Sequence, residues 1–342
     1  MKEQIADGLT AMSMLTVRAP ARLHLGFLDL NADIGRKFGS IGLAIKSHST
    51  SISVTAGEQF AITLHKPNES LKAKLIQLID VFYGTVGCHI PNAQRSLNII
   101  VDSHITQHSG LGSGTQLALT ISTALAKYHC IEISTPELAA KMGRGKRSGI
   151  GIATFDRGGF IIDGGVKPKQ TVPPVLFTRD FPEHWHIVLI CSDNFQGVHG
   201  KAETSAFNDL PLFPIDSARE INHITLMQLL PALVEEDIDS FGDAITQIQA
   251  LIGDHFASAQ GGRYSSEAVA NCLLESQRLG HKGIAQSSWG PTGCVFVDSE
   301  AKADKLIEQL TSHVSDILPA TERPTFIKTT ANNTGALIET FV

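Results

Sequence analysis

Apolar and polar residues alternate along the first part of the chain, and this pattern predicts strands. Residues 1–13 are interpreted as a short extension. From Leu15 to Leu25 every second residue is apolar. Strict alternation places the apolar side chains on one face of a half-buried strand. Shorter patterns of this kind predict strands at residues 41–45, 51–54, 60–64, 97–101 and 159–163.

Helical spacing occurs between these strands. Residues 70–83 repeat leucine and isoleucine at helical spacing, and residues 116–128 are apolar on nearly every face. The second segment therefore predicts a buried helix. A third helix is predicted from Thr135 to about Gly143, and a glycine-rich stretch follows as far as Gly165.

The second half of the chain has a different order of elements. Residues 166–183 are rich in proline and lysine and are interpreted as a connection. Beyond them the pattern predicts, in order, a strand at 186–191, helices near 217–234, 236–257 and 265–279, a strand at 293–297, a helix at 300–312 and a strand at 325–330. Grouped strands and helices of this kind predict an α+β layer rather than a doubly wound sheet. With 342 residues the chain is too long for one ordinary core, so we predict two domains, 14–170 and 171–342.

Composition narrows the class of protein. The chain is 42% hydrophobic and 18% charged, which is typical of a soluble globular protein. Its net charge of −6 argues against nucleic acid as a partner. The five scattered cysteines show no zinc-site spacing, and we expect them to be reduced. With no signal peptide and no apolar run long enough for a membrane span, we expect a cytoplasmic protein without a membrane partner.

One segment carries the clearest chemical signal. The sequence Ser-Gly-Leu-Gly-Ser-Gly-Thr at residues 109–115 follows a strand and a polar loop, and it opens the helix at 116–128. Small residues let backbone N–H groups approach phosphate oxygens, and a helix N-terminus adds partial positive charge. A simple turn between strand and helix is the alternative. The predicted phosphate-binding residues are Gly110, Leu111, Gly112, Ser113, Gly114, Thr115 and Gln116.

A basic cluster follows the third predicted helix. Arg144, Lys146, Arg147 and Arg157 alternate with glycines. Arginine suits bidentate recognition of phosphate or carboxylate, so we expect Arg144 or Arg147 to bind an anion. A solvated basic loop is the alternative.

Three further side chains allow more than one interpretation. His24 lies on one face of the first strand with Arg22, where it is either structural or part of a site. Trp289 either stacks on an aromatic ligand or fills core. Glu203 follows a Gly-rich loop and is a further candidate for the cleft.

Two motifs resemble those of the GHMP kinase superfamily. Residues 19–26, Ala-Pro-Ala-Arg-Leu-His-Leu-Gly, resemble its first motif, and residues 110–115 resemble its ATP phosphate loop. The resemblance implies a GHMP-kinase-like two-domain α+β fold. Its N-terminal domain is of the βαβ type and its C-terminal domain is ferredoxin-like.

The sequence departs from the kinases at two places. Gly151 occupies the position of the usual catalytic aspartate in the segment 148–151. Trp289 and Pro291 stand where the third, glycine-rich kinase motif is expected. Together these departures make phosphoryl transfer the weaker interpretation.

The chain resembles more closely a non-kinase branch, the β-ribofuranosylaminobenzene 5′-phosphate synthases of tetrahydromethanopterin biosynthesis. The resemblance rests on Arg22-Leu23-His24-Leu25 with Asp29, on 110–116, on 143–145 with 148–151, on 155–160 and on 286–292. It implies that phosphoribosyl diphosphate condenses with 4-aminobenzoate or 4-hydroxybenzoate, releasing CO2 and diphosphate. It also implies a homodimer.

The implied chemistry gives each candidate residue a role. Mg²⁺ is the expected metal, with Asp29 and Asp156 as candidate ligands. Neither pyridoxal phosphate nor ATP is expected as a cofactor. Candidate catalytic residues are Arg22, His24 and Asp156, and candidate substrate-binding residues are Arg144, Arg147, Ser148, Ser287, Ser288, Trp289 and Thr292. The alternatives are an ATP-dependent small-molecule kinase, a transferase with another aromatic acceptor, and a non-catalytic phosphometabolite sensor.

Overall fold

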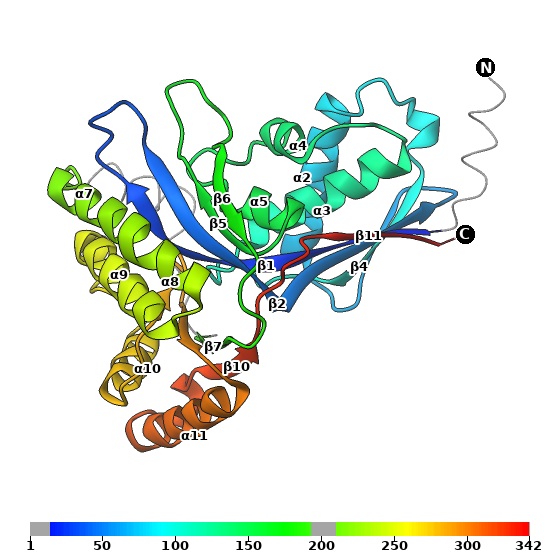
Figure 1. The fold of residues 1–342 in the computed structure, drawn as a ribbon. Coiled ribbons are helices and arrows are strands. Elements are labelled where there is room, and N and C mark those ends of the chain that lie inside the picture. The colour runs from blue at the N-terminus through cyan, green and yellow to red at the C-terminus, as the bar shows by residue number, and fades with distance from the viewer. Residues whose placement is uncertain (1–13, 193–209, 342) are drawn as a thin grey trace.

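The computed structural model describes residues 14–192 and 210–341, and these form two β-sheets with helices packed around them (Figure 1). The first sheet contains seven strands, with β11, β1, β2, β4 and β3 side by side, β5 paired with β2, and β6 paired with β5. Its strands are β1 (Met14–Asp29), β2 (Phe38–Ala56), β3 (Ala61–Leu64), β4 (Leu97–Ser103), β5 (Phe160–Asp163), β6 (Val175–Arg179) and β11 (Leu337–Phe341).

A βαβ unit lies at one edge of this sheet. Strands β3 and β4 are parallel, and α2 (Glu69–Thr85) connects them. The other helices of this half are α3 (Ser113–Tyr128), α4 (Thr135–Lys141) and α5 (Ile150–Asp156). Apolar side chains of α2 and α3, such as Leu75 and Leu119, form one core with Leu15 and Val17 of β1. Burial of this apolar surface holds the helices on the sheet.

The second sheet has the order β10, β7, β9, β8 and is antiparallel throughout. Its strands are β7 (His186–Cys191), β8 (Ile284–Gln286), β9 (Thr292–Val297) and β10 (Thr325–Thr329). The helices of this half are α7 (Ile215–Ile224), α8 (Leu230–Glu235), α9 (Ile238–Gln260), α10 (Glu267–Arg278) and α11 (Glu300–Ile317), with a π-helical turn at Thr225–Leu229 between α7 and α8.

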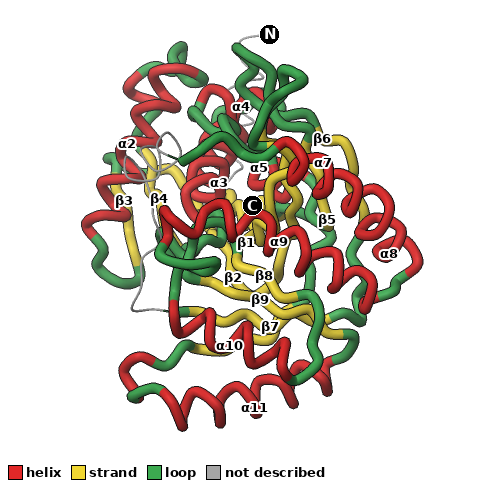
Figure 2. Tube along the Cα trace, turned by 90° about the vertical axis from the view of Figure 1, so that its left-hand side faces the viewer, coloured by secondary structure: helices red, strands yellow, loops and turns green. Residues whose placement is uncertain are grey.

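Both faces of the second sheet are buried. Val188 and Ile190 of β7 pack with α10 and α11, which lie on the side away from the first sheet (Figure 2). Ile187 and Leu189 point the other way, into a core shared with α7, α9 and the middle of β1. This shared core joins the two halves of the molecule.

A register shift divides β1 into two parts. The pairing with β2 slips between Pro20 and Ala21. Before the slip, odd-numbered side chains such as Val17 belong to the core with α2 and α3; after it, Leu23 and Leu25 belong to the shared core. Such irregularities re-aim side chains. After the slip, the even-numbered Arg22 and His24 share one face of β1, and both lie around the same cavity as Thr115 near the start of α3.

The strand pairing differs from the expected division of the chain at 170/171. Residues 166–183 contain β6, which pairs with β5, and β11 returns from the end of the chain to pair with β1. The predicted strands at 41–45 and 51–54 are one long strand, β2. The glycine-rich stretch contains α5, which was not predicted as a helix. Within the described ranges, no helix is long and apolar enough to cross a membrane.

Candidate functional site

The loop at 109–115 leads directly into α3. Gly112, at φ 87°, is the N-cap, and no side chain of the described chain caps this helix start. Only glycine adopts this left-handed conformation readily. Ser113 and Gly114 of the first turn line an adjoining cavity, so the partial positive charge of the helix N-terminus is accessible to an anion.

Residues of the second half of the chain contact the loop at 109–115 and hold it in place. Ser287 Oγ donates a hydrogen bond of 2.8 Å to Gly110 O, and Thr292 Oγ1 donates one of 2.7 Å to Ser109 O. A Cβ on Gly110 would lie 2.9 Å from Gly290 Cα and would overlap Ser287 O. The two backbones therefore touch, and Ser287 and Thr292 hold the loop rather than line a cavity.

Two arginines flank the loop. Arg22 N donates to Leu111 O at 3.1 Å, and its Nη1 donates to Gly110 O. A Cβ on Gly112 would lie 3.0 Å from Arg22 Cγ, and one on Gly114 would lie 3.5 Å from Arg144 Nη1. The absence of side chains at these glycines lets both guanidinium groups approach the start of α3.

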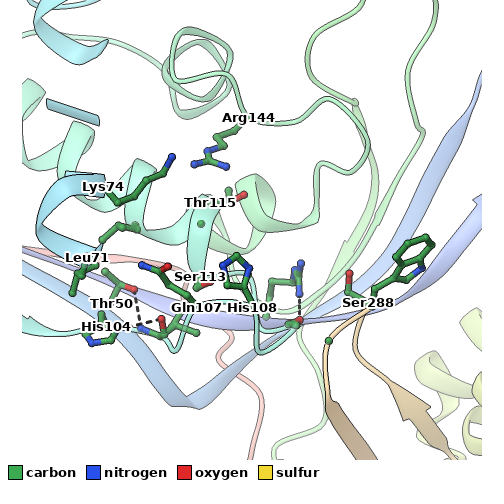
Figure 3. A pocket seen from close by; sticks show the side chains of 18 residues that line it. Thr50, Leu71, Lys74, His104, Gln107, His108, Ser113, Thr115, Arg144 and Ser288 are labelled. Atoms are coloured by element: carbon green, nitrogen blue, oxygen red, sulfur yellow. Dashed lines mark hydrogen bonds between the residues drawn. The ribbon is translucent and has the colours of Figure 1, made fainter. Parts of the chain in front are cut away.

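The cavity above the loop is lined by cations. We call it the loop cavity; its volume is about 570 Å³, and Arg22, Lys74, Arg144, Ser288 and the loop glycines lie on its wall. Lys74 and Arg144 point toward the same space above the start of α3 (Figure 3). Among the described residues that line it there is no aspartate or glutamate.

Burial and mutual repulsion disfavour the charged forms of the basic side chains around this cavity. Burial lowers the pKa of Lys74, and the positive charge of Arg144 lowers it further. Burial also lowers the pKa of Arg144, whose Nε has no hydrogen-bond partner in the described structure. A bound anion would relieve this repulsion and supply the absent partner.

A second cavity, of about 520 Å³, lies on the other side of Arg22 and Arg144. We call it the arginine cavity. It is lined by Arg22, His24, Phe27, Lys37, Phe38, Thr115, Gly143, Arg144, Gly145, Lys146, Arg147, Ser148, Gly151 and Ser288. Four residues, Arg22, Thr115, Arg144 and Ser288, line both cavities and form the wall between them. No carboxylate is among its described lining residues either.

Buried Asp163 shapes the basic segment of this cavity. Its Oδ2 accepts hydrogen bonds from Gly149 N at 2.8 Å and from Ser148 Oγ at 3.4 Å, and its Oδ1 accepts one from Gly165 N at 2.9 Å. Burial raises the pKa of Asp163 to about 6, although these hydrogen bonds act in the opposite direction. Sequence reasoning missed this residue; a carboxylate at the end of an apolar strand was the available signal.

His24 lines the arginine cavity and Trp289 the loop cavity, and both line a small cavity of about 30 Å³ between them. Burial, together with the charge of Arg22, lowers the pKa of His24 to about 3, so its imidazole is neutral at pH 7. The Trp289 ring packs edge-on against Phe256 of α9, with centroids 4.8 Å apart. Trp289 is only 6% exposed, so it fills core while its edge contributes to the cavity wall.

Two buried glutamines tie Trp289 and its neighbours to β1. Gln249 Nε2 donates to Leu25 O at 2.6 Å, and Gln249 Oε1 accepts from Gln286 N at 2.9 Å. Gln286 Nε2 then donates to Ser288 O at 3.0 Å. Ser288 N in turn donates to His24 O, also at 3.0 Å. This network fixes Ser288 in the wall between the cavities.

Several predicted site residues lie elsewhere. Leu111 is buried in the shared core, and Gln116 Nε2 donates to Gly151 O at 2.8 Å, so neither lines a cavity. Asp29 Oδ1 accepts hydrogen bonds from two backbone N–H groups of the turn that follows β1. Asp156 is exposed and bonds Thr135 Oγ1 at 2.8 Å. Glu203 lies outside the described residues.

Several residues that line the cavities were not predicted, among them Lys74, Phe27 and Phe38. Lys74 of α2 stands at helical spacing from the buried Leu71, and this cation on an apolar helix face was a readable signal. Phe27 and Phe38 face each other across the β1–β2 hairpin, with ring centroids 5.8 Å apart. Their pairing depends on the register of that hairpin, which the sequence does not reveal.

The sequence matches two family descriptions. Residues 74–159 match the GHMP kinases N terminal domain, and residues 229–316 match GHMP kinases C terminal. Solved structures of the same fold include homoserine kinase from Cytophaga hutchinsonii, with a TM-score of 0.64 at 15% identity, covering 96% of this chain and 98% of that one. Mevalonate diphosphate decarboxylase from Staphylococcus aureus gives a TM-score of 0.66 at 16% identity, with coverage of 97% and 99%. The expected GHMP-kinase-like α+β fold is confirmed.

Curated relatives are considerably more similar in sequence. Beta-ribofuranosylphenol 5'-phosphate synthase from Archaeoglobus fulgidus is 34% identical over 304 residues, covering 84% of this chain and 89% of the relative. The protein of the same name from Methanothermobacter thermautotrophicus is 31% identical over 295 residues, with coverage of 81% and 87%. The chain thus belongs to the beta-ribofuranosylphenol 5'-phosphate synthase family, which is built on the GHMP kinase fold.

Proposed function

We propose that this protein joins phosphoribosyl diphosphate to a 4-substituted benzoate, with release of CO2 and diphosphate, in tetrahydromethanopterin biosynthesis. The name of its relatives specifies a phenol as the product, so 4-hydroxybenzoate is the first acceptor to test and 4-aminobenzoate the second. The observation that carries the proposal is the pair of cation-lined cavities that meet at Arg22 and Arg144.

The loop cavity suits the diphosphate. Backbone N–H groups at the start of α3, the hydroxyls of Ser113 and Thr115, and the charges of Lys74 and Arg144 converge on it. When the bond from C1 of the ribose to diphosphate breaks, negative charge develops on the departing oxygen. Fixed dipoles and cations aimed at that charge lower the barrier.

The arginine cavity suits the aromatic acid. Phe27 and Phe38 offer an apolar wall for a ring, while Arg144 and Arg147 can bind its carboxylate. Gly151 also lines this cavity, at the position where the kinases that this sequence resembles carry their aspartate. It has no side chain, and a Cβ there would lie 3.0 Å from Thr115 Cγ2. The position therefore presents no carboxylate to repel an anionic acceptor.

The reaction follows from this placement. The ring carbon that bears the carboxylate uses a π electron pair to bond C1 of the ribose, and diphosphate departs with the electron pair of the C1–O bond. The carboxylate then leaves as CO2, and the electrons of its C–C bond restore the aromatic ring. The protein positions the two reactants and stabilises charge, and both contributions lower the barrier.

The described residues do not form a protein cage for Mg²⁺. The Asp29 carboxylate accepts hydrogen bonds from the turn after β1, and the Asp156 carboxylate accepts one from Thr135. In the described part of the chain, no three His, Cys, Asp or Glu side chains lie close enough together to hold a metal ion. We propose that Mg²⁺ accompanies the diphosphate and is held by phosphate oxygens and water. A homodimer in the cytoplasm also remains part of the proposal.

The test is a single incubation of the protein with phosphoribosyl diphosphate, Mg²⁺ and carboxyl-labelled 4-hydroxybenzoate or 4-aminobenzoate, without ATP. We expect labelled CO2 and diphosphate in equal amounts. Arg144→Met serves as the variant and Arg157→Met as its control, because exposed Arg157 lines neither cavity. A requirement for ATP, or CO2 release that Arg144→Met leaves unchanged, contradicts the proposal.

A further inference from the structure

One buried side chain of the arginine cavity has an unused hydrogen-bonding atom. His24 Nε2 is buried and, within the described residues, has no hydrogen-bond partner. His24 is only 4% exposed; it lines the arginine cavity and a small cavity beside Gln249 and Trp289, but not the loop cavity. Leaving a buried polar atom without a hydrogen-bond partner is unfavourable. A ligand that donates a hydrogen bond to this atom would remove the cost.

The surroundings of His24 fix its ring and its protonation. Its N–H donates to Ser287 Oγ at 3.0 Å, its carbonyl accepts from Ser288 N at 3.0 Å, and its ring meets Phe27 edge-on at 4.7 Å. An interaction of the ring with its own backbone acts to raise the pKa of His24, so we assign the proton of the neutral ring to Nδ1; Nε2 has no partner in the described structure. The neutral imidazole thus presents a lone pair at Nε2 and no proton.

This makes His24 unusual among the groups that surround the cavity. The other polar side chains there are cations, which only donate, or the hydroxyls of Thr115, Ser148 and Ser288, which both donate and accept. A substrate group that must donate a hydrogen bond inside this cavity has His24 Nε2 as a pure acceptor. The carboxylate of the aromatic acid cannot use it, because it has no proton to give.

We infer that His24 Nε2 binds the para hydroxyl of the aromatic acceptor and takes its proton during carbon–carbon bond formation. This inference rests on the proposed function. The ring carbon that attacks must meet the sugar at the wall shared by Arg22 and Arg144. The para substituent then points away from that wall, into the part of the arginine cavity that the loop cavity does not share and that His24 lines.

The proton transfer balances the reaction. As the ring carbon bonds C1 of the ribose and diphosphate leaves, positive charge develops on the ring and makes the para O–H strongly acidic. Nε2 takes that proton, and the ring becomes a neutral dienone. Loss of CO2 returns the electron pair to the ring, and the oxygen recovers the proton from His24 to give the phenol.

The neighbouring charges suit a base of this kind. Arg22 and Arg147 both face His24 and disfavour its protonated form, as does burial. The imidazole therefore stays unprotonated until the very acidic para O–H is formed, and it returns the proton readily afterwards. General base catalysis by a positioned side chain contributes about 10²- to 10⁴-fold to a rate.

Binding tests the contact without requiring turnover. The full-length protein, saturated with inorganic diphosphate, is titrated calorimetrically with 4-hydroxybenzoate and with 4-fluorobenzoate, which has a similar size but no proton to donate. We expect the wild-type protein to bind 4-hydroxybenzoate about tenfold more tightly than 4-fluorobenzoate, because a hydrogen bond to an otherwise unpaired group has about this effect. His24→Leu should lose this preference, and His24→Gln, which places an acceptor near Nε2, should retain part of it. His186→Leu at the start of β7 lines neither cavity and serves as the matched control.

Turnover tests the base. With 4-hydroxybenzoate we expect His24→Leu to lower kcat at least a hundredfold while KM for phosphoribosyl diphosphate stays unchanged. Turnover combined with an unchanged hydroxyl preference in His24→Leu would overturn the inference and leave the proposed function standing. A His24-dependent preference without any turnover would support the contact and overturn the proposed reaction. No binding of 4-hydroxybenzoate by the wild-type protein would overturn both.

Discussion

The raised pKa of Asp163 gives this residue a measurable effect on stability. Its carboxyl has an ordinary pKa of 3.8 and a pKa of about 6 in the folded protein. Because the folded-state value is the higher one, its favourable contribution is complete below pH 3.8 and is lost as the pH rises through 6. Relative to Asp163→Asn, we expect the free energy of unfolding of the wild-type protein to fall by about 2 kcal/mol from pH 4 to pH 7.

Urea unfolding of both proteins at several pH values across this range measures the difference. Fluorescence and circular dichroism should give coincident transitions, which checks that unfolding is two-state. A difference in stability that is independent of pH would show that burial does not govern this carboxyl.

Gly110 offers a second test, of the contact between the two halves. Gly110 has a φ of 84°, which alanine adopts only with strain, and the Cβ of an alanine there would overlap Ser287 O. Gly280→Ala is the matched control, because Gly280 has a φ of 89° but no atom within 4 Å of its Cβ position. We expect Gly280→Ala to cost about 1 kcal/mol of stability and to leave diphosphate binding unchanged.

Gly110→Ala should cost more stability than this control and weaken diphosphate binding at least tenfold, because the loop must move off its support. Urea unfolding and calorimetry measure the two effects. If both alanine variants bind diphosphate as the wild-type protein does, the contact with Ser287 and Gly290 is not needed for the site.

At the scale of residues, positions that depend on local sequence were predictable. The loop glycines and the cluster around Arg144 line the cavities, and the sequence indicated them because their signal lies in neighbouring residues of the chain. Asp163 and Lys74 were missed because each acts through a partner distant in sequence. Ser287 and Thr292 were assigned to the substrate, whereas the structure shows them holding the loop.

At the scale of elements, helix α2 makes the next prediction. Lys74 lies on its inner face and lines the loop cavity, while Lys72 is exposed on the same helix. We expect Lys74→Met to weaken binding of inorganic diphosphate by about tenfold, because one charge-assisted contact to phosphate is lost. Lys72→Met should have no such effect. Calorimetry at low salt measures both, and equal losses in the two variants would indicate only a general effect of net charge.

The elements themselves were predictable where the pattern is long and regular. The predicted strand at 186–191 is β7, and the apolar segment at 116–128 lies within α3. The pattern failed where tertiary contacts decide. Helix α5 forms in a glycine-rich stretch because Asp163 and Gln116 bond its backbone. Strand β6 is exposed at four of its five residues, and it exists because β5 pairs with it.

At the scale of the whole molecule, the two cavities are positively charged although the chain as a whole is negatively charged. The chain carries −6, yet the described walls of the cavities contain only cations among their charged groups. An anion between the two halves should therefore stabilise the entire fold. At one hundred times its Kd, inorganic diphosphate should add about 2.7 kcal/mol and raise Tm by a few degrees.

Thermal unfolding with and without diphosphate checks this expectation. The rise in Tm should shrink with added salt, because screening weakens charge interactions. It should vanish in Arg144→Met and persist in Arg157→Met. A rise that Arg144→Met retains would place the bound anion elsewhere on the protein.

The position of β11 has a consequence for synthesis. Residues Leu337–Phe341 form the edge of the first sheet by pairing with Met14–Arg18 of β1. During translation the ribosome delivers β1 early and β11 after every other described strand. Until then the outer edge of β1 exposes unpaired N–H and C=O groups, which can bind another strand. A nascent chain of this protein is therefore open to strand addition, by a chaperone or by an aggregating neighbour, throughout the synthesis of its second half.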